Sequence, residues 1–195
     1  MDLQTHPLTP ARWADFARLF RKSGACAGCC RQWWRLQHAQ WVAQNGAGDR
    51  RTMRLLVKSG KPTGVLTYAA GRVAGWCAVA PRAEYGRLAN SLVLQPVDDQ
   101  PVWSVTCFFV ALESRRRGFT GALLNAATDF AHRCGAQCLE GYPTEPAREQ
   151  ADAFVYTGLA SAFRRARFRE VARRSPRRPI FRRRLHPTRS FKKKS

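Results

Sequence analysis

The stretch Arg115–Gly121 reads RRRGFTG and joins an apolar run, Val102–Leu112, to an amphipathic run, Gly121–Cys134. The apolar run predicts a strand and the amphipathic run predicts a helix. The first turn of a helix has unpaired backbone N–H groups and partial positive charge, which together attract phosphate. Gly118 allows the backbone to approach a ligand closely, and three neighbouring guanidinium groups add charge and bidentate donors. The stretch therefore predicts a phosphate-binding loop, with a solvated basic loop as the alternative.

Length and composition favour one globular domain. The chain of 195 residues suffices for one core, and its 45% of hydrophobic residues suits a soluble protein. The longest apolar runs are too short to span a bilayer, and the N-terminus, MDLQTHPLTP, lacks the pattern of a secretory signal. We therefore expect a cytoplasmic protein without membrane contact. Its single domain should occupy residues 1–175, with N-terminal helices and a Cys/Trp-rich loop in residues 1–60 and a core in residues 65–172.

The net charge of +21 is concentrated near the C-terminus. Residues 163–195 contain 15 Lys or Arg and one acidic residue, whereas the first 162 residues contain 19 basic and 12 acidic residues. From Arg173 onward the chain is nearly all charge and proline, and we expect residues 176–195 to form a disordered basic tail. Such a segment attracts polyanions, so it predicts contact with nucleic acid or the ribosome.

Seven cysteines in a chain without a secretory signal do not predict disulfides. Three of them lie in Gly24–Arg35, which reads GACAGCCRQWWR. Cys26 and Cys29 have the spacing of two zinc ligands and His38 offers a third, but no fourth ligand is evident, so we expect no metal. A redox-sensitive or substrate-lining loop and plain packing remain the other interpretations of this loop, which also contains Cys30.

Hydrophobic periodicity and turn signals predict alternating helices and strands. The predicted helices span Pro10–Phe20, Asp49–Lys58, Tyr85–Ala89, Gly121–Cys134 and Gly158–Ala166, and the predicted strands span Val65–Ala69, Val73–Val79, Val102–Val110, Gln137–Tyr142 and Phe168–Ala172. The first two strands form a predicted hairpin. Residues 102–142 form a predicted βαβ unit with parallel strands. The pattern therefore predicts an α/β protein.

The strand, the arginine–glycine loop and the helix resemble the GNAT superfamily of N-acetyltransferases. Its signature is Gln or Arg, two residues, Gly, one residue, then Gly or Ala, and Arg115, Gly118 and Thr120 take these positions. The closing segment Phe163–Phe168 resembles the family's Tyr-x-x-x-Gly-Phe pattern, with Phe163 in place of the tyrosine and Arg167 in place of the glycine. Further stretches, such as Gly75–Arg82, resemble a bacterial subgroup of unassigned substrate.

The resemblance implies a mixed, centrally splayed sheet flanked by helices and acetyl-CoA as the co-substrate. The pyrophosphate would bind the loop and helix start, and the pantetheine arm would pair with the backbone of the splayed strand. The residues expected to bind the co-substrate are Phe108, Phe109, Val110, Arg115, Arg116, Arg117, Gly118, Phe119, Thr120 and Gly121.

Direct acyl transfer requires a deprotonated amine and a proton for the leaving thiolate. Glu140 lies in a strand-like run beside the expected splay, so we predict it as the general base, with an arginine-paired structural carboxylate as the alternative. Tyr156 and Tyr142 are the candidate phenols for the proton donor, and we predict Tyr156, because it begins the late helix. An acyl-cysteine route through Cys107 is less favoured, because buried strand cysteines are usually inert.

The sequence therefore predicts an acetyl-CoA-dependent N-acyltransferase acting on an undefined amine acceptor. The alternative is a catalytically weak protein of the same fold that binds nucleic acid or the ribosome through its basic tail.

Overall fold

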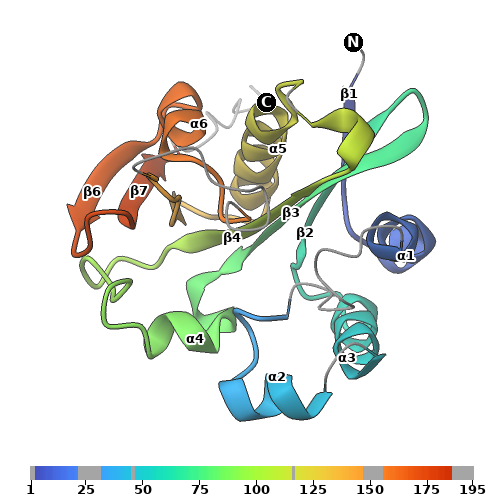
Figure 1. Ribbon diagram of the computed structural model, residues 1–195, viewed down its shortest axis with the longest axis horizontal. Helices are drawn as coiled ribbons and strands as arrows, with labels where there is room; N and C mark the ends of the chain where they lie inside the picture. The colour runs from blue at the N-terminus through green and yellow to red at the C-terminus, as the bar shows by residue number, and fades with distance from the viewer. Residues whose placement is uncertain (1–2, 22–31, 45–46, 116, 147–155, 186–195) are drawn as a thin grey trace, which may run out of the picture.

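The computed structural model describes residues 3–21, 32–44, 47–115, 117–146 and 156–185. A seven-stranded mixed sheet runs through its centre in the order β1-β2-β3-β4-β5-β7-β6 (Figure 1). All neighbouring strands are antiparallel except β4 and β5, which are parallel. The strands are β1 (Leu3–Pro7), β2 (Gly64–Ala69), β3 (Arg72–Pro81), β4 (Trp103–Val110), β5 (Cys138–Gly141), β6 (Arg169–Arg173) and β7 (Pro179–Arg184).

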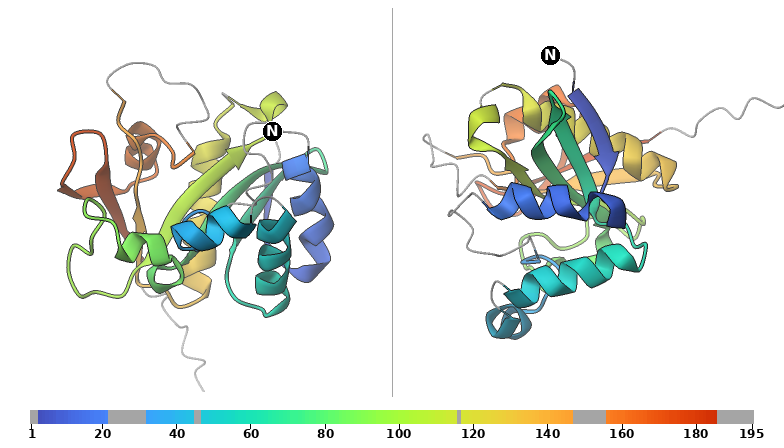
Figure 2. Two further views of the ribbon diagram at one scale, coloured as in Figure 1. Left: turned by 60° about the horizontal axis from the view of Figure 1, so that its bottom comes forward. Right: turned by 90° about the vertical axis from the view of Figure 1, so that its right-hand side faces the viewer.

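Helices cover both faces of the sheet (Figures 1 and 2). Apolar side chains of α5 and α6 pack on one face, and those of α1 and α3 pack on the other. The helices are η1 (Pro10–Arg12), α1 (Trp13–Arg21), α2 (His38–Gln44), α3 (Ala47–Lys58), η3 (Arg82–Glu84), α4 (Gly86–Ala89), η4 (Leu112–Ser114), α5 (Phe119–Arg133) and α6 (Ala160–Arg165). None of the helices that the structure describes is long and apolar enough to cross a membrane.

The structure confirms the predicted α/β class, the β2–β3 hairpin and the parallel β4–α5–β5 unit. Cys77, Cys107 and Cys138 are buried free cysteines on strands. Burial raises the pKa of the Cys77 thiol well above its usual value, as expected for an inert core thiol.

One boundary was wrong. Residues 176–195 were expected to be disordered, but Pro179–Arg184 form β7, which lies between β5 and β6. Ile180 and Phe181 are fully buried on opposite faces of the sheet, and the charge of Arg182 is matched by the buried Glu140. These two buried apolar residues and the ion pair order a segment whose high charge predicted disorder. Strand β1 and helix α2 were not predicted, and residues 186–195 lie outside the described residues.

The sheet splays beside β4. Strands β4 and β5 pair only from Trp103↔Leu139 to Val105↔Gly141, whereas β4 continues alongside β3 as far as Val110. The β3–β4 register shifts between Ala78 and Val79, which places a bulge at Thr106 on β4. Residues 106–110 of β4 therefore have no β5 partner. The predicted central splay is confirmed.

Candidate functional site

The start of α5 has the geometry of an anion-binding helix terminus. Gly118 is the N-cap residue with φ of 80°, in the left-handed region that favours glycine, and no side chain caps the helix. A Cβ atom built at Gly118 or Gly121 meets no other atom within 4 Å, so the space next to this backbone is open. The first N–H groups of a 15-residue helix are thus accessible to a bound anion, whereas the N–H of Gly121 donates to the carbonyl oxygen of Gly118 at 3.1 Å.

The side chains of this loop differ in what they can offer to a bound anion. Arg115 donates from Nε to the carbonyl oxygen of Val110 at 3.1 Å, which ties the loop to the end of β4. Arg117 is exposed, Thr120 is partly exposed and Phe119 is buried, so Phe119 offers only its backbone. Arg116 lies outside the described residues.

The three β4 residues predicted to contact the co-substrate all lie in the splayed part of the strand. Phe108 packs against Phe163 on the α5 face, with ring centroids 6.0 Å apart, and Phe109 packs against Phe20 on the other face, with centroids 4.9 Å apart. Val110 follows at the end of the strand. Because both aromatic side chains are buried in the core, they fix the strand and leave its backbone to face the gap.

Residues 156–160 lie in the gap between the splayed strands β4 and β5. The N–H of Phe108 donates to the carbonyl oxygen of Tyr156 at 2.6 Å. Further along, Thr144 donates to Gly158 at 2.8 Å and accepts from Ala160 at 3.1 Å, forming a parallel bridge. The Tyr156 ring is partly buried and packs against two of the apolar clusters. The structure therefore brings Tyr156 to the splayed strand, as its predicted role requires, but with its carbonyl against the backbone of Phe108.

Glu140 lies in a buried network of charges. Its side chain is 0% exposed, and its two oxygens accept from Arg82 at 2.9 Å and from Arg182 at 2.7 Å. The Tyr142 hydroxyl donates to the same carboxylate at 2.6 Å. Arg82 also donates to the Tyr142 hydroxyl and to the carbonyl oxygens of Leu88 and Leu94. With both oxygens bonded and no exposed surface, Glu140 has the environment of an arginine-paired structural carboxylate rather than that of a general base.

Tyr142, the phenol weighed against Tyr156 as the proton donor, follows directly after β5. Burial, followed by the charge of Glu140, raises the pKa of the Tyr142 phenol well above its usual value, so the phenol stays protonated. Its hydroxyl also contacts the Ser104 hydroxyl at 2.8 Å. Tyr142 follows Glu140 by two residues, and this spacing places both side chains on one face of a strand. That spacing was the signal in the sequence that could have linked them.

Among the described residues, no group of three or more His, Cys, Asp or Glu side chains is placed to hold a metal ion. Cys26, Cys29 and Cys30, which raised the question of a metal half-site, lie outside the described residues. The groups that suit an elongated phosphate-bearing ligand are the open first turn of α5 and the splayed backbone of β4.

Comparison with known proteins gives one consistent family. Residues 30–156 match the model of the acetyltransferase (GNAT) family. No curated protein matches the sequence.

Solved structures share the fold at low sequence identity. They include a Drosophila melanogaster polyamine N-acetyltransferase that catalyses the formation of N-acetylagmatine (TM-score 0.54, 12% identity, 94% of this chain and 100% of that chain). The PaiA N-acetyltransferase from Thermoplasma acidophilum, in complex with coenzyme A, has a TM-score of 0.52 at 9% identity (95% and 100% covered). A GNAT-family acetyltransferase from Streptococcus agalactiae has a TM-score of 0.57 at 11% identity (94% and 96% covered).

Proposed function

The chain belongs to the GNAT family of acetyltransferases, and we propose that it transfers the acetyl group of acetyl-CoA directly to the nitrogen of an amine. The observation that supports this most is the open, glycine-capped first turn of α5 directly after the splayed end of β4. A helix terminus suits a pyrophosphate, and an unpaired strand suits the amides of a pantetheine arm.

We assign the pyrophosphate to the backbone N–H groups of residues 118–120, with Gly121 leaving open space beside them and with Arg116 and Arg117 supplying charge. Arg115 holds the loop to β4 through Val110. The pantetheine arm would pair with the backbone of Phe108, Phe109 and Val110. Because the Phe108 N–H is bonded to Tyr156 in this structure, the carbonyl of Tyr156 must move away before a ligand can pair there.

In the proposed reaction, the lone pair of the amine nitrogen attacks the thioester carbonyl carbon, and the C–S bond then breaks. The nitrogen loses a proton and the leaving thiolate gains one, so both need a nearby group or water. Tyr156 adjoins the splayed strand and is our proposed proton donor to the thiolate. For Glu140 we propose a positioning role, in which it holds Arg82 and Tyr142 at the end of β5.

The acceptor is proposed only as an amine. The structural relatives that act on polyamines or agmatine share the fold alone, and a protein of net charge +21 repels polycations. We therefore expect an acidic amine, or an amine presented on a polyanion, to be the better acceptor. A panel that pairs cationic amines with amines carrying carboxylate or phosphate groups, followed by release of free thiol, tests this preference.

A second candidate function is binding of nucleic acid or the ribosome through the basic C-terminal residues. It is favoured by the charge of residues 163–195, which carry 15 basic residues and one acidic residue. This function and acetyl transfer can coexist, because their proposed sites use different residues.

Binding of acetyl-CoA is tested by thermal unfolding. Ligand at about 100 times its Kd stabilises a protein by about 2.7 kcal/mol, which raises the Tm of a chain of this size by about 5–10 °C. Gly118→Glu places a carboxylate in the open space at the α5 terminus and should abolish the shift. Gly71→Glu is the matched control, because Gly71 also has a positive φ of 71° and open surroundings but lies in the β2–β3 turn. No shift of the wild-type protein at millimolar acetyl-CoA would exclude the proposed enzyme.

A further inference from the structure

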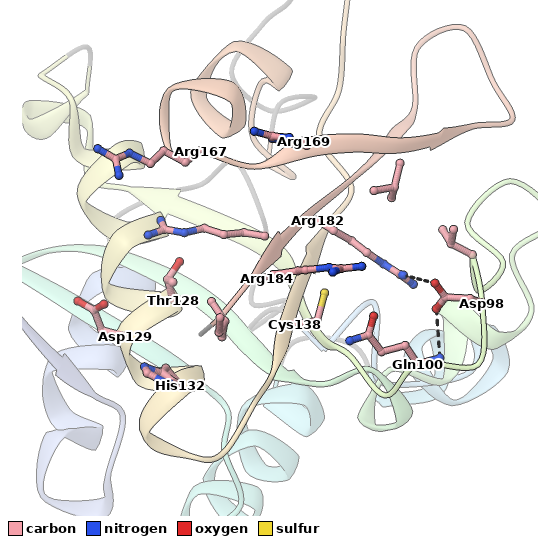
Figure 3. A pocket seen from close by; sticks show the side chains of 14 residues that line it. Asp98, Gln100, Thr128, Asp129, His132, Cys138, Arg167, Arg169, Arg182 and Arg184 are labelled. Atoms are coloured by element: carbon pink, nitrogen blue, oxygen red, sulfur yellow. Dashed lines mark hydrogen bonds and ion pairs between the residues drawn. The ribbon is translucent and has the colours of Figure 1, made fainter. Parts of the chain in front are cut away.

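A cavity of about 750 Å³ lies at the edge of the molecule formed by β5, β6 and β7, α5 and the loop before β4 (Figure 3). Five arginines line it, against two aspartates, Asp98 and Asp129. The arginines come from the turn after α6 and from strands β6 and β7: Arg167, Arg169, Arg182, Arg183 and Arg184. The lining is therefore strongly basic.

This cavity is separate from the proposed acetyl-CoA site. Its α5 residues, Thr128 to His132, lie in the second half of that helix, whereas the anion-binding terminus is at Gly118. The 14 residues between Gly118 and His132 correspond to about 20 Å along a helix. The cavity also adjoins Cys138, at the end of β5 away from the splay. A pyrophosphate bound at the helix start does not account for it.

The arginines of the cavity divide into two groups. Arg182 and Arg183 are anchored: Arg182 bonds to Glu140 at 2.7 Å and to Asp98 at 2.6 Å, and Arg183 donates to the carbonyl oxygen of Ala166 at 3.0 Å. The hydrogen bond from Arg182 lowers the pKa of Asp98, so this aspartate stays ionised. Its negative charge is balanced by Arg182 in the wall of the cavity.

The second group is unpaired. In the part of the chain that the structure describes, the side chains of Arg167, Arg169 and Arg184 make no hydrogen bond or ion pair. Figure 3 shows them spread over different elements around the cavity rather than gathered at one point. Three guanidinium groups without a hydrogen-bonded partner thus line the cavity beside the ion-paired Arg182, and the charge of Arg184 also acts on Asp98.

Arg167 occupies a backbone conformation that costs free energy. Its φ is 64°, in the left-handed region that non-glycine residues rarely adopt. A side chain at such a position costs about 1 kcal/mol or more relative to glycine. An arginine placed there at this cost, with its side chain on the cavity and without an internal partner, is consistent with a role in binding.

We propose that this cavity binds the sugar–phosphate backbone of a nucleic acid. Guanidinium groups bind phosphate oxygens through paired N–H donors, and several of them spread over an edge suit a polymer with regularly repeated phosphates. The described lining includes no Phe, Tyr or Trp, so it offers no platform for stacked bases. Recognition is therefore by backbone charge and independent of base sequence. The site belongs to the folded domain and uses arginines from the first part of the basic stretch 163–195, but none of residues 186–195.

The test is fluorescence anisotropy with a short labelled RNA strand and its duplex, over a salt range of about 50–200 mM. Three full-length variants each remove three positive charges. Arg167→Ala/Arg169→Ala/Arg184→Ala removes the unpaired cavity arginines. Arg50→Ala/Arg51→Ala/Arg54→Ala removes exposed arginines of α3, which lies across the molecule from β6 and β7 in Figure 1. Lys192→Ala/Lys193→Ala/Lys194→Ala removes the C-terminal lysines.

The cavity variant should bind at least tenfold more weakly at about 0.1 M salt, and the slope of log K against log salt should fall by about 2–3 units, since each phosphate contact contributes about 0.7–0.9. The α3 variant should change the slope by less than about one unit. Equal losses in the cavity and α3 variants, or a loss confined to the lysine variant, would overturn the proposal. So would displacement of RNA by inorganic phosphate at equal phosphate concentration, which would indicate a site for a small anion.

The cavity variant should keep the acetyl-CoA-dependent rise in Tm of the wild-type protein. The outcome for nucleic acid is therefore independent of the outcome for acetyl transfer, and either can fail alone. Anionic lipid vesicles serve as a further probe: binding of vesicles without binding of RNA would replace the proposed ligand by a membrane surface.

Discussion

Replacing Glu140 by glutamine distinguishes between two roles for this residue, a structural carboxylate and a general base. The substitution keeps the volume of the side chain but removes the charge that matches Arg82 and Arg182, and its amide NH2 faces a guanidinium donor. Removing one partner of a buried ion pair costs about 3–5 kcal/mol. Because Arg182 keeps Asp98, and Arg82 keeps the carbonyl oxygens of Leu88 and Leu94, we expect the lower end, about 3 kcal/mol.

The measurement is the free energy of unfolding in urea, together with Tm. A loss of about 3 kcal/mol corresponds to a fall in Tm of about 6–12 °C for a chain of this size. Glu145→Gln is the matched control: Glu145 also bridges two arginines, Arg164 at 2.7 Å and Arg173, but its side chain is 34% exposed and those of the two arginines are 50% and 30% exposed. Such pairs contribute less than about 1 kcal/mol, so the control should stay within about 4 °C of the wild type.

Turnover gives the second readout, measured at a temperature where both proteins are folded. A positioning role predicts that Glu140→Gln retains measurable turnover with the wild-type pH profile. A general base predicts a fall in kcat of about 10²–10⁴-fold and loss of the acidic limb of the profile. Unchanged stability combined with that fall would refute the structural interpretation and restore Glu140 as the catalytic base.

Three further experiments test other parts of the structure. Burial raises the pKa of Asp49 from 3.8 to about 6, and its carboxylate has no hydrogen-bond partner among the described residues. The folded state therefore binds the proton more tightly than the unfolded state, so the free energy of unfolding falls as pH rises from about 4 through 6. Asp49→Asn should be more stable than the wild type by about 1–3 kcal/mol at pH 8 but not at pH 4. Urea unfolding at both pH values measures this difference. Gly141→Ala should lower the free energy of unfolding by about 1–3 kcal/mol, because the new Cβ overlaps the buried Phe163 ring. In the control Gly121→Ala the new Cβ meets no atom within 4 Å, so this substitution should be neutral or stabilising. Equal effects of the two substitutions on unfolding in urea would contradict the packing around Gly141. Tyr156→Phe should lower kcat at least tenfold with the acetyl-CoA-dependent Tm shift intact, and unchanged thiol release would exclude Tyr156 as the proton donor.

The strand–loop–helix at the centre of the fold could be predicted because all its signals are local. An apolar run, a glycine that adopts positive φ and an amphipathic run follow each other between Trp103 and Arg133, and each sets its own backbone geometry. The βαβ connection then follows from chain direction alone. The splay was predicted from the family resemblance, because no local sequence pattern specifies it.

The last strand could not be predicted in this way. Its sequence, PIFRRR, contains two adjacent apolar residues whose side chains enter different faces, followed by three arginines, so neither alternation nor net hydrophobicity indicates a central strand. What orders it is the pairing of Arg182 with Glu140, a contact between residues 42 positions apart. For the same reason the sequence offered an arginine partner for Glu140 only as an alternative, and the identity of the two arginines, Arg82 and Arg182, became visible only in the folded chain.

The position of β7 also has a consequence for the time course of folding. Strands β1 to β4 are neighbours in chain order, but β7 is the final strand in sequence and must enter between β5 and β6. Until Arg182 has been synthesised, the edge of β5 is unpaired and the Glu140 carboxylate lacks one of its two cations. At about 5–20 residues per second, the 42 residues between them take roughly 2–8 s to synthesise. The nascent chain therefore passes through an interval in which the β5 edge of its sheet is open, and chaperone contact should be strongest then.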